Sequence, residues 1–278
     1  MSNQRTHYVT TTDGVTIGGT VHGEGPPLVF LPGVVGDGDL DWQGVLPHLT
    51  DRFTCHLLSN RGRGLSGDHP DHSIGRFVED VIAYLDSIGE PTGIVGWSLG
   101  AAMSLMAAAQ SDAVNAIAPF EPGVMSLADG QEQATMGGAI ARTGELAGQG
   151  KLVAAVSAFL DGVFNEEEIA AAENAGYCES AGRHVPHLLQ FFQQAMESGL
   201  PTVAEDAAVV GAISVPVLVL KGADTKPFFA ESARFVAEHA PNAQVHEIPG
   251  AGHAAPLTHP EALAKALTEF FSTAQQPA

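Results

Sequence analysis

The central motif of the chain is Gly96-Trp97-Ser98-Leu99-Gly100, a glycine-flanked serine between two apolar segments. Residues 93–96 are typical of the end of a buried strand, and residues 101–109 are rich in helix-forming alanine, leucine and methionine. A serine at a sharp turn between a strand and a helix is the context in which G-x-S-x-G forms a nucleophile elbow. Such a turn strains the serine backbone, and glycine neighbours leave room for it. The motif therefore predicts Ser98 as a nucleophile at the positive end of a helix dipole.

The overall composition indicates a globular, acidic protein. Of its 278 residues 45% are hydrophobic, enough for one large domain or for a core domain with an insertion. The 12 lysines and arginines and 32 aspartates and glutamates give a formal charge of −20, so neither nucleic acid nor an anionic membrane is expected as a partner. Neither Cys55 nor Cys178 has metal-ligand spacing, and Cys55 is expected to be a buried small hydrophobe. Without an apolar leader or a membrane-length run, we expect a soluble cytoplasmic protein.

Strand-like and helical segments alternate along most of the chain. Strands are expected at 7–12, 15–22, 27–32, 53–59, 93–96, 114–120, 215–220 and 244–248, with a hairpin turn at Asp13-Gly14. Helices are expected at 42–49, at 74–88 with Ser73 as N-cap, and at 101–109, 228–239 and 260–271. This alternation predicts an α/β fold in which helices cover both faces of a parallel sheet.

The alternation stops between residues 123 and 211, where the chain has helical segments alone, for example 151–162, 166–176 and 187–198. We therefore expect a core domain of residues 1–122 and 212–278, and a helical cap of residues 123–211 over the carboxyl edge of the sheet, where ligands bind. Five apolar cap residues are candidates for lining a pocket, although such residues more often belong to a core: Met125, Phe159, Phe164, Phe191 and Phe192. An apolar pocket would favour small or medium hydrophobic acyl or alkyl groups.

A serine nucleophile needs a base and donors for the oxyanion. Of the 12 histidines, His253 lies in a glycine-flanked loop just after the last expected strand, and its place after Ser98 near the C-terminus matches the hydrolase order. Its role would be to take the Ser98 proton and to return it to the leaving group. The oxyanion donors are expected to be the backbone N–H groups of Leu99 and Val34.

Two carboxylates could orient this histidine. Asp224 follows the strand after the cap, and Glu121 ends the strand before the cap. Adjacent parallel strands end side by side, so either carboxylate can reach the same space. Each also has a simpler interpretation: Asp224 as a turn residue that caps the next helix, and Glu121 as a hinge carboxylate under the cap.

No metal site is expected from the sequence. His184 and His187 could share a helix face, but no third ligand is evident. Asp37, Asp39 and Asp41 lack the spacing and the glycine of a calcium loop, so they are expected to form a solvated acidic turn.

The chain resembles proteins of the α/β-hydrolase fold over nearly its whole length. Five segments carry the resemblance: Leu31–Gly33, Asn60–Ser66, Gly96–Gly100, Val217–Gly222 and Pro249–His253. They are specific for the fold and much less so for the substrate.

Three positions depart from the family pattern. Pro32-Gly33 stands where the family usually has His-Gly, and Asn60 stands where it usually has Asp. The commonest acid position of the family is occupied by Thr225, with Asp224 one residue early. A branch of the family that includes haloalkane dehalogenases has its acid after the earlier strand, and Glu121 is similar to that placement. Because a shift of one residue would aim the shorter carboxylate elsewhere, we favour Glu121 over Asp224.

The nucleophile narrows the chemistry. Dehalogenases and epoxide hydrolases of this fold attack with aspartate, whereas Ser98 implies acyl transfer through an acyl-enzyme. The leading hypothesis is a cofactor-free serine hydrolase that acts on small hydrophobic carboxylic esters or lactones. The alternatives are a C–C bond hydrolase, a perhydrolase or an acyltransferase with the same triad, and a binding protein that kept the fold without turnover. The sequence leaves the oligomeric state open, a homodimer included.

Overall fold

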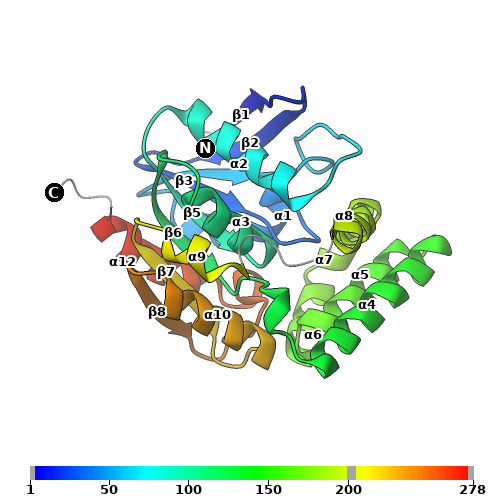
Figure 1. Cartoon of the computed structure of the whole chain (residues 1–278). Coiled ribbons are helices and arrows are strands. Elements are labelled where there is room, and N and C mark those ends of the chain that lie inside the picture. The colour runs from blue at the N-terminus through cyan, green and yellow to red at the C-terminus, as the bar shows by residue number, and fades with distance from the viewer. Residues whose placement is uncertain (1–3, 199–204, 275–278) are drawn as a thin grey trace.

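The computed structural model describes residues 4–198 and 205–274, and its centre is a single sheet (Figure 1). The strands follow the order β1-β2-β4-β3-β5-β6-β7-β8. β2 pairs antiparallel with both β1 and β4, and the other neighbours pair parallel. The bounds are β1 Arg5–Thr10, β2 Thr16–His22, β3 Pro27–Leu31, β4 Thr54–Leu58, β5 Thr92–Trp97, β6 Val114–Phe120, β7 Val217–Gly222 and β8 Ala243–Ile248. The prediction of an α/β fold with a mostly parallel sheet is confirmed.

Helices cover both faces of this sheet, since β3, β4 and β5 are buried along their whole length. α3 lies against β3, β5 and β6, and α12 contacts β6 and β8. α3 begins directly after Ser98, and eight of its ten residues are Ala, Leu or Met, so it can be buried all round. The core helices are α1 Gly38–Trp42, α2 Ile74–Ile88, α3 Leu99–Ala108, α10 Pro227–His239, α11 Ala255–Thr258 and α12 Pro260–Ala274.

The helix expected at 42–49 is wrong. The chain is helical earlier, in α1, because the Asp37 side chain accepts a hydrogen bond from the Leu40 N–H and caps that helix. A separate 3₁₀ turn, η1 Leu46–His48, follows with Pro47 in its first turn. The apolar spacing of this segment reflects burial of an irregular connection and not one continuous helix.

The described residues between β6 and β7 form helices and 3₁₀ turns and no strand. Five of these helices form a layer beside the core (Figure 1): α4 Gly130–Gly148, α5 Leu152–Val163, α6 Glu166–Asn174, α7 Tyr177–Ala181 and α8 Val185–Ser198. We call α4–α8 the cap. Two 3₁₀ turns, η2 Met125–Leu127 and η3 Gly182–His184, also occur in this segment. The short α9, Ala207–Gly211, packs against α3 and α10 and so lies on the core.

A buried ion-pair cluster fixes the loop after β4. The Arg61 guanidinium donates two hydrogen bonds of 2.7 Å to the Asp80 carboxylate in α2. It donates a third, of 3.0 Å, to Asp13 in the β1–β2 turn. The Arg61 side chain is only 1% exposed, so these bonds replace its hydration and tie the loop to two other elements.

Two expectations from composition can be compared with the fold. Cys55 is buried in β4, as predicted, and Cys178 is buried as well; neither forms a disulfide. Among residues 4–198 and 205–274, every helix is too short or too polar to cross a membrane.

Candidate active site

Ser98 lies at a strained turn between β5 and α3. Its backbone has φ +56° and ψ −110°, outside the regions that L residues usually adopt. The flanking glycines are required by space, because a Cβ on Gly96 would lie 2.2 Å from the Gly100 carbonyl oxygen, and one on Gly100 would lie 2.4 Å from that of Leu31. The Ser98 side chain is half-buried and lies in a cavity beneath the cap.

His253 lies in the loop after β8 and is 2% exposed. Its Nδ1 donates a 2.6 Å hydrogen bond to the Glu121 carboxylate, and its backbone carbonyl accepts one of 2.8 Å from the Trp97 indole. The Phe229 ring stacks on the imidazole with centroids 3.6 Å apart. With Nδ1 as the donor, the lone pair is on Nε2. His253 and Ser98 line the same small cavity beside Gly33.

Glu121 follows β6 and is completely buried, with a left-handed backbone at φ +47°. One carboxylate oxygen accepts a 2.7 Å bond from the Gly222 N–H at the end of β7, and the other accepts a 2.9 Å bond from the Thr225 hydroxyl in addition to that from His253. The three donors lie at or after the carboxyl ends of β7 and β8, on the same edge of the sheet as Glu121 at the end of β6. This is why Glu121 contacts His253 although the two are 132 residues apart in the sequence.

Asp224 has a different environment. Its side chain is exposed, and the hydrogen bond that holds it in the loop comes from its backbone N–H, which donates to the Ala251 carbonyl. The structure therefore brings Glu121 and His253 together and leaves the Asp224 carboxylate at the surface. The sequence analysis did not find the supporting contacts of Trp97, Thr225 and Phe229. Only Thr225 carried a signal, since it occupies the position where an acid is common.

The two expected oxyanion donors flank the same cavity as Ser98. Leu99 is the first residue of α3, so its N–H has no partner within the helix. Val34 follows Gly33, whose N–H donates a 2.8 Å hydrogen bond to the Asp41 carboxylate. Asp41 is completely buried, and burial raises the pKa of its carboxyl to about 7.

The expected solvated acidic turn is wrong, because Asp37 and Asp41 are buried and Asp39 is half-buried. Asp37 accepts hydrogen bonds from Arg183 and His184 of the cap, both at 2.9 Å. Burial alone would raise the pKa of Asp37, but the bonds from His184, the Leu40 N–H and Arg183 outweigh it and hold this pKa below its usual value. Asp37 is therefore a structural acceptor between the core and the cap, whereas Asp39 accepts a hydrogen bond from Thr20 of the core.

His187 has two neighbours that the sequence analysis missed. Its Nε2 lies 3.4 Å from Asp68, which also accepts a 2.8 Å bond from His72, and the ligand atoms of the three residues lie within 4.8 Å of one another. Neither imidazole Nδ1 has a partner in the part of the chain that the structure describes. Metal-bound histidines normally donate a hydrogen bond from their second nitrogen. The cluster fits a hydrogen-bonded contact between cap and core better than a metal centre.

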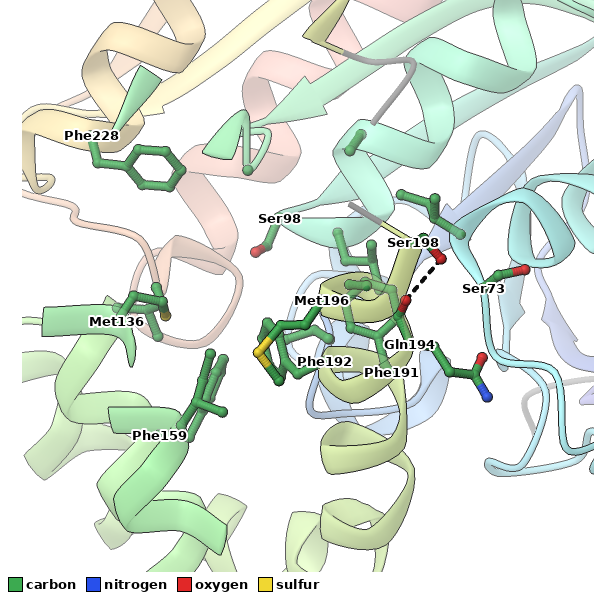
Figure 2. A pocket seen from close by; sticks show the side chains of 18 of the residues that line it. Ser73, Ser98, Met136, Phe159, Phe191, Phe192, Gln194, Met196, Ser198 and Phe228 are labelled. Carbon is green, nitrogen blue, oxygen red and sulfur yellow. Dashed lines mark hydrogen bonds between the residues drawn. The ribbon is translucent and has the colours of Figure 1, made fainter. Parts of the chain in front are cut away.

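The cavity above Ser98 is apolar and has a volume of about 240 Å³. Phe159, Phe191 and Phe192 of the cap reach into it, with Met136 and Phe228 around them (Figure 2). Phe164 lines the smaller cavity next to His253, and the side chain of Met125 lies outside the described part of the structure. No charged side chain is among the described residues that line the main cavity.

An elbow serine, a histidine–carboxylate pair and an eight-stranded, mostly parallel sheet define the α/β-hydrolase class. The model of the alpha/beta hydrolase fold family matches residues 26–260, and the chain belongs to this family. It is a hydrolase of this fold.

Three relatives illustrate the range of its similarity. The pimeloyl-[acyl-carrier protein] methyl ester esterase of Chromobacterium violaceum is 29% identical over 262 residues, covering 90% of this chain and 96% of the relative. The 2-(acetamidomethylene)succinate hydrolase of Mesorhizobium japonicum is 25% identical, covering 92% and 91%. The crystal structure of an alpha/beta hydrolase from Sphaerobacter thermophilus has a TM-score of 0.72 at 27% identity, covering 95% of this chain and all of that one.

Proposed function

We propose that the protein is a serine esterase that cleaves small, uncharged, hydrophobic carboxylic esters or lactones through an acyl-enzyme on Ser98. The observation that carries the proposal is the 2.6 Å bond between His253 and the buried Glu121, next to a cavity that Ser98 shares with His253. The methyl ester esterase of C. violaceum, similar over nearly its whole length, supports an ester as the bond that is cleaved.

In the proposed mechanism, His253 Nε2 takes the Ser98 proton while Oγ attacks the ester carbonyl. Glu121 holds Nδ1–H in the tautomer that this requires and stabilises the imidazolium that forms. The tetrahedral oxyanion would lie between the Leu99 and Val34 N–H groups, at the N-terminus of α3. His253 then gives its proton to the leaving alcohol, and water repeats the sequence to release the acid.

The lining of the main cavity supports an uncharged acyl group. A carboxylate in the cavity would lose its hydration without meeting a cationic partner, since the described lining residues include none. This argues against a substrate like the succinate in the name of the M. japonicum relative. A volume of about 240 Å³ is at the small end for ligand pockets, so a short or medium acyl chain is expected.

Hydrolysis of p-nitrophenyl esters from acetate to dodecanoate tests this function, with the wild type measured beside Ser98→Ala. We expect turnover with a short- or medium-chain optimum and a loss of at least ~10³-fold in Ser98→Ala. Circular dichroism should show the same fold in both proteins. Turnover that persists in the variant would contradict Ser98 as nucleophile, and a folded wild type with no ester turnover would contradict the esterase proposal.

A further inference from the structure

A carboxylate of the cap is bonded to the loop that carries His253. Glu168, in the first turn of α6, is 4% exposed. Its Oε1 accepts a 2.6 Å hydrogen bond from the N–H of Ala254, and its Oε2 accepts one of 3.0 Å from the N–H of Asn165. The loop approaches so closely that a Cβ on Gly252 would lie 2.7 Å from both carboxylate oxygens.

This arrangement uses a helix cap for a second purpose. In a capping box the glutamate at the third helical position accepts a hydrogen bond from the N–H of the N-cap residue, here Asn165. This bond uses only one of the two oxygens of the Glu168 carboxylate. The other oxygen reaches the core and binds the amide that follows His253. The peptide group between His253 and Ala254 is thus held at both of its polar atoms: its carbonyl accepts from the Trp97 indole, and its N–H donates to Glu168.

A tyrosine of the cap makes a similar connection to the loop after β3, which contains Gly33 and Val34. Tyr177, the first residue of α7, is 3% exposed, and its hydroxyl donates a 2.9 Å bond to Asp41. The other oxygen of Asp41 accepts the Gly33 N–H, directly before Val34. Tyr177 therefore acts on the loop with the expected oxyanion donor through one intervening carboxylate.

Both connections come from one short segment. α6 contacts α11, which follows the His253 loop, and α7 contacts α1, which follows the Gly33 loop. By contrast, α8 and α4 contribute the apolar side chains Phe191, Phe192 and Met136 to the cavity (Figure 2). The cap thus has one part that faces substrate and another that holds backbone of the core.

We propose that Glu168 and Tyr177 are positioning residues, through which α6–α7 holds the histidine loop and the oxyanion loop in their working geometry. This inference rests on the proposed serine-hydrolase function. Neither side chain lines the main apolar cavity, and Tyr177, which borders the small cavity beside Ser98, has its hydroxyl bonded to Asp41. Loss of either polar group should therefore lower kcat much more than it changes KM. A displacement of about 1 Å in a catalytic group can cost on the order of 10²-fold in rate.

The test compares Glu168→Ala, Glu168→Gln and Tyr177→Phe with Asn165→Ala in the full chain. Glu168→Ala removes the acceptor for Ala254, whereas Glu168→Gln keeps one oxygen for it and gives up the capping bond. Asn165→Ala weakens the helix cap by ~1 kcal/mol but leaves the backbone N–H of Asn165 and the Glu168–Ala254 bond in place. It is therefore the control for a role in cap stability alone.

For p-nitrophenyl butyrate we expect Glu168→Ala to lower kcat by ~10- to 100-fold with KM within about twofold. Glu168→Gln should recover most of this loss although its melting temperature falls, and Asn165→Ala should lower the melting temperature with kcat unchanged. Tyr177→Phe should also lower kcat at unchanged KM, by no more than the ~10²–10³-fold that loss of a whole oxyanion donor costs. If Asn165→Ala lowers kcat as much as Glu168→Ala, or if Glu168→Ala keeps the wild-type kcat, the proposal is wrong.

Hydrogen–deuterium exchange separates this proposal from the proposed function, because it needs no substrate. Amides of peptides covering residues 249–258 should exchange faster in Glu168→Ala, and those covering 31–36 faster in Tyr177→Phe. Unchanged exchange in both loops would overturn the positioning role even if the wild type is an active esterase. If the two variants exchange faster but the wild-type protein hydrolyses no ester, the loop contacts are established and only the esterase assignment is contradicted.

Discussion

Replacing Glu121 by glutamine is the sharpest test of the site. The carboxylate accepts hydrogen bonds from three donors, namely the Gly222 N–H, the Thr225 hydroxyl and His253 Nδ1–H. Glutamine keeps one acceptor oxygen, which can serve the Gly222 N–H. Its NH₂ group then faces His253, which must turn to the tautomer with a bare Nδ1 and a proton on Nε2. The histidine can no longer accept the Ser98 proton.

The expected loss follows from this tautomer change. In a serine protease the corresponding amide substitution lowers kcat by ~10⁴ while the geometry stays intact. A factor of 10⁴ corresponds to ~5.4 kcal/mol of transition-state stabilisation, at 1.36 kcal/mol per tenfold. Asp224→Asn is the matched control, because its side chain is exposed and its change in stability should stay within ~0.5 kcal/mol.

The assay is kcat for p-nitrophenyl butyrate, with the rate of Ser98 labelling by a fluorophosphonate as a second readout that does not depend on the ester chosen. Melting temperatures of both variants should be recorded to exclude unfolding. If Glu121→Gln keeps more than ~10% of kcat, when ~10⁴-fold is the loss expected from the wrong tautomer, or if Asp224→Asn loses more than it does, the reasoning from the His253–Glu121 bond fails.

Three further outcomes follow from buried groups and from the cavity. Arg61→Met should lower the free energy of unfolding in urea by ~3–5 kcal/mol because it leaves buried charge unpaired, whereas Arg234→Met, on the surface, should change it by less than ~0.5 kcal/mol; equal effects would contradict the ion-pair argument. The pKa of Asp41 is raised to about 7 by burial, so the folded state binds this proton more tightly than the unfolded chain, and stability should fall as the pH rises from about 4 to 7. Melting temperatures measured from about pH 4 to 7 should therefore decline less in Asp41→Asn than in the wild type. If the two proteins show the same dependence of melting temperature on pH, the prediction is wrong. Phe192→Ala should enlarge the cavity and raise kcat/KM for octanoate relative to acetate esters by ~10-fold; an unchanged ratio would mean that the acyl chain lies elsewhere.

Local rules predicted the parts of the chain whose structure depends on nearby residues. The elbow at Ser98 was predictable because the G-x-S-x-G motif lies between a strand-like and a helical segment, and a Cβ on Gly96 would meet the backbone of the same turn. Gly100, by contrast, is required by the close approach of Leu31 in β3. Continuous apolar runs predicted the buried parallel strands, since both faces of such a sheet are covered. The segment at 42–49 was mispredicted because its apolar residues face the core from an irregular connection, with the helix start set by the Asp37 cap.

The partners of buried polar groups were decided by tertiary structure. The sequence by itself determined an α/β hydrolase core, a serine at its elbow and two candidate acids for His253. It could not choose firmly between Glu121 and Asp224, since that depends on which strand end faces the histidine loop. Nor could it show that Glu168 binds the amide after His253, or that Asp41 is buried beneath Gly33. A buried carboxylate requires donors, but sequence spacing carries no information on donors that lie 86 or 132 residues away and meet it only after the sheet and cap have assembled.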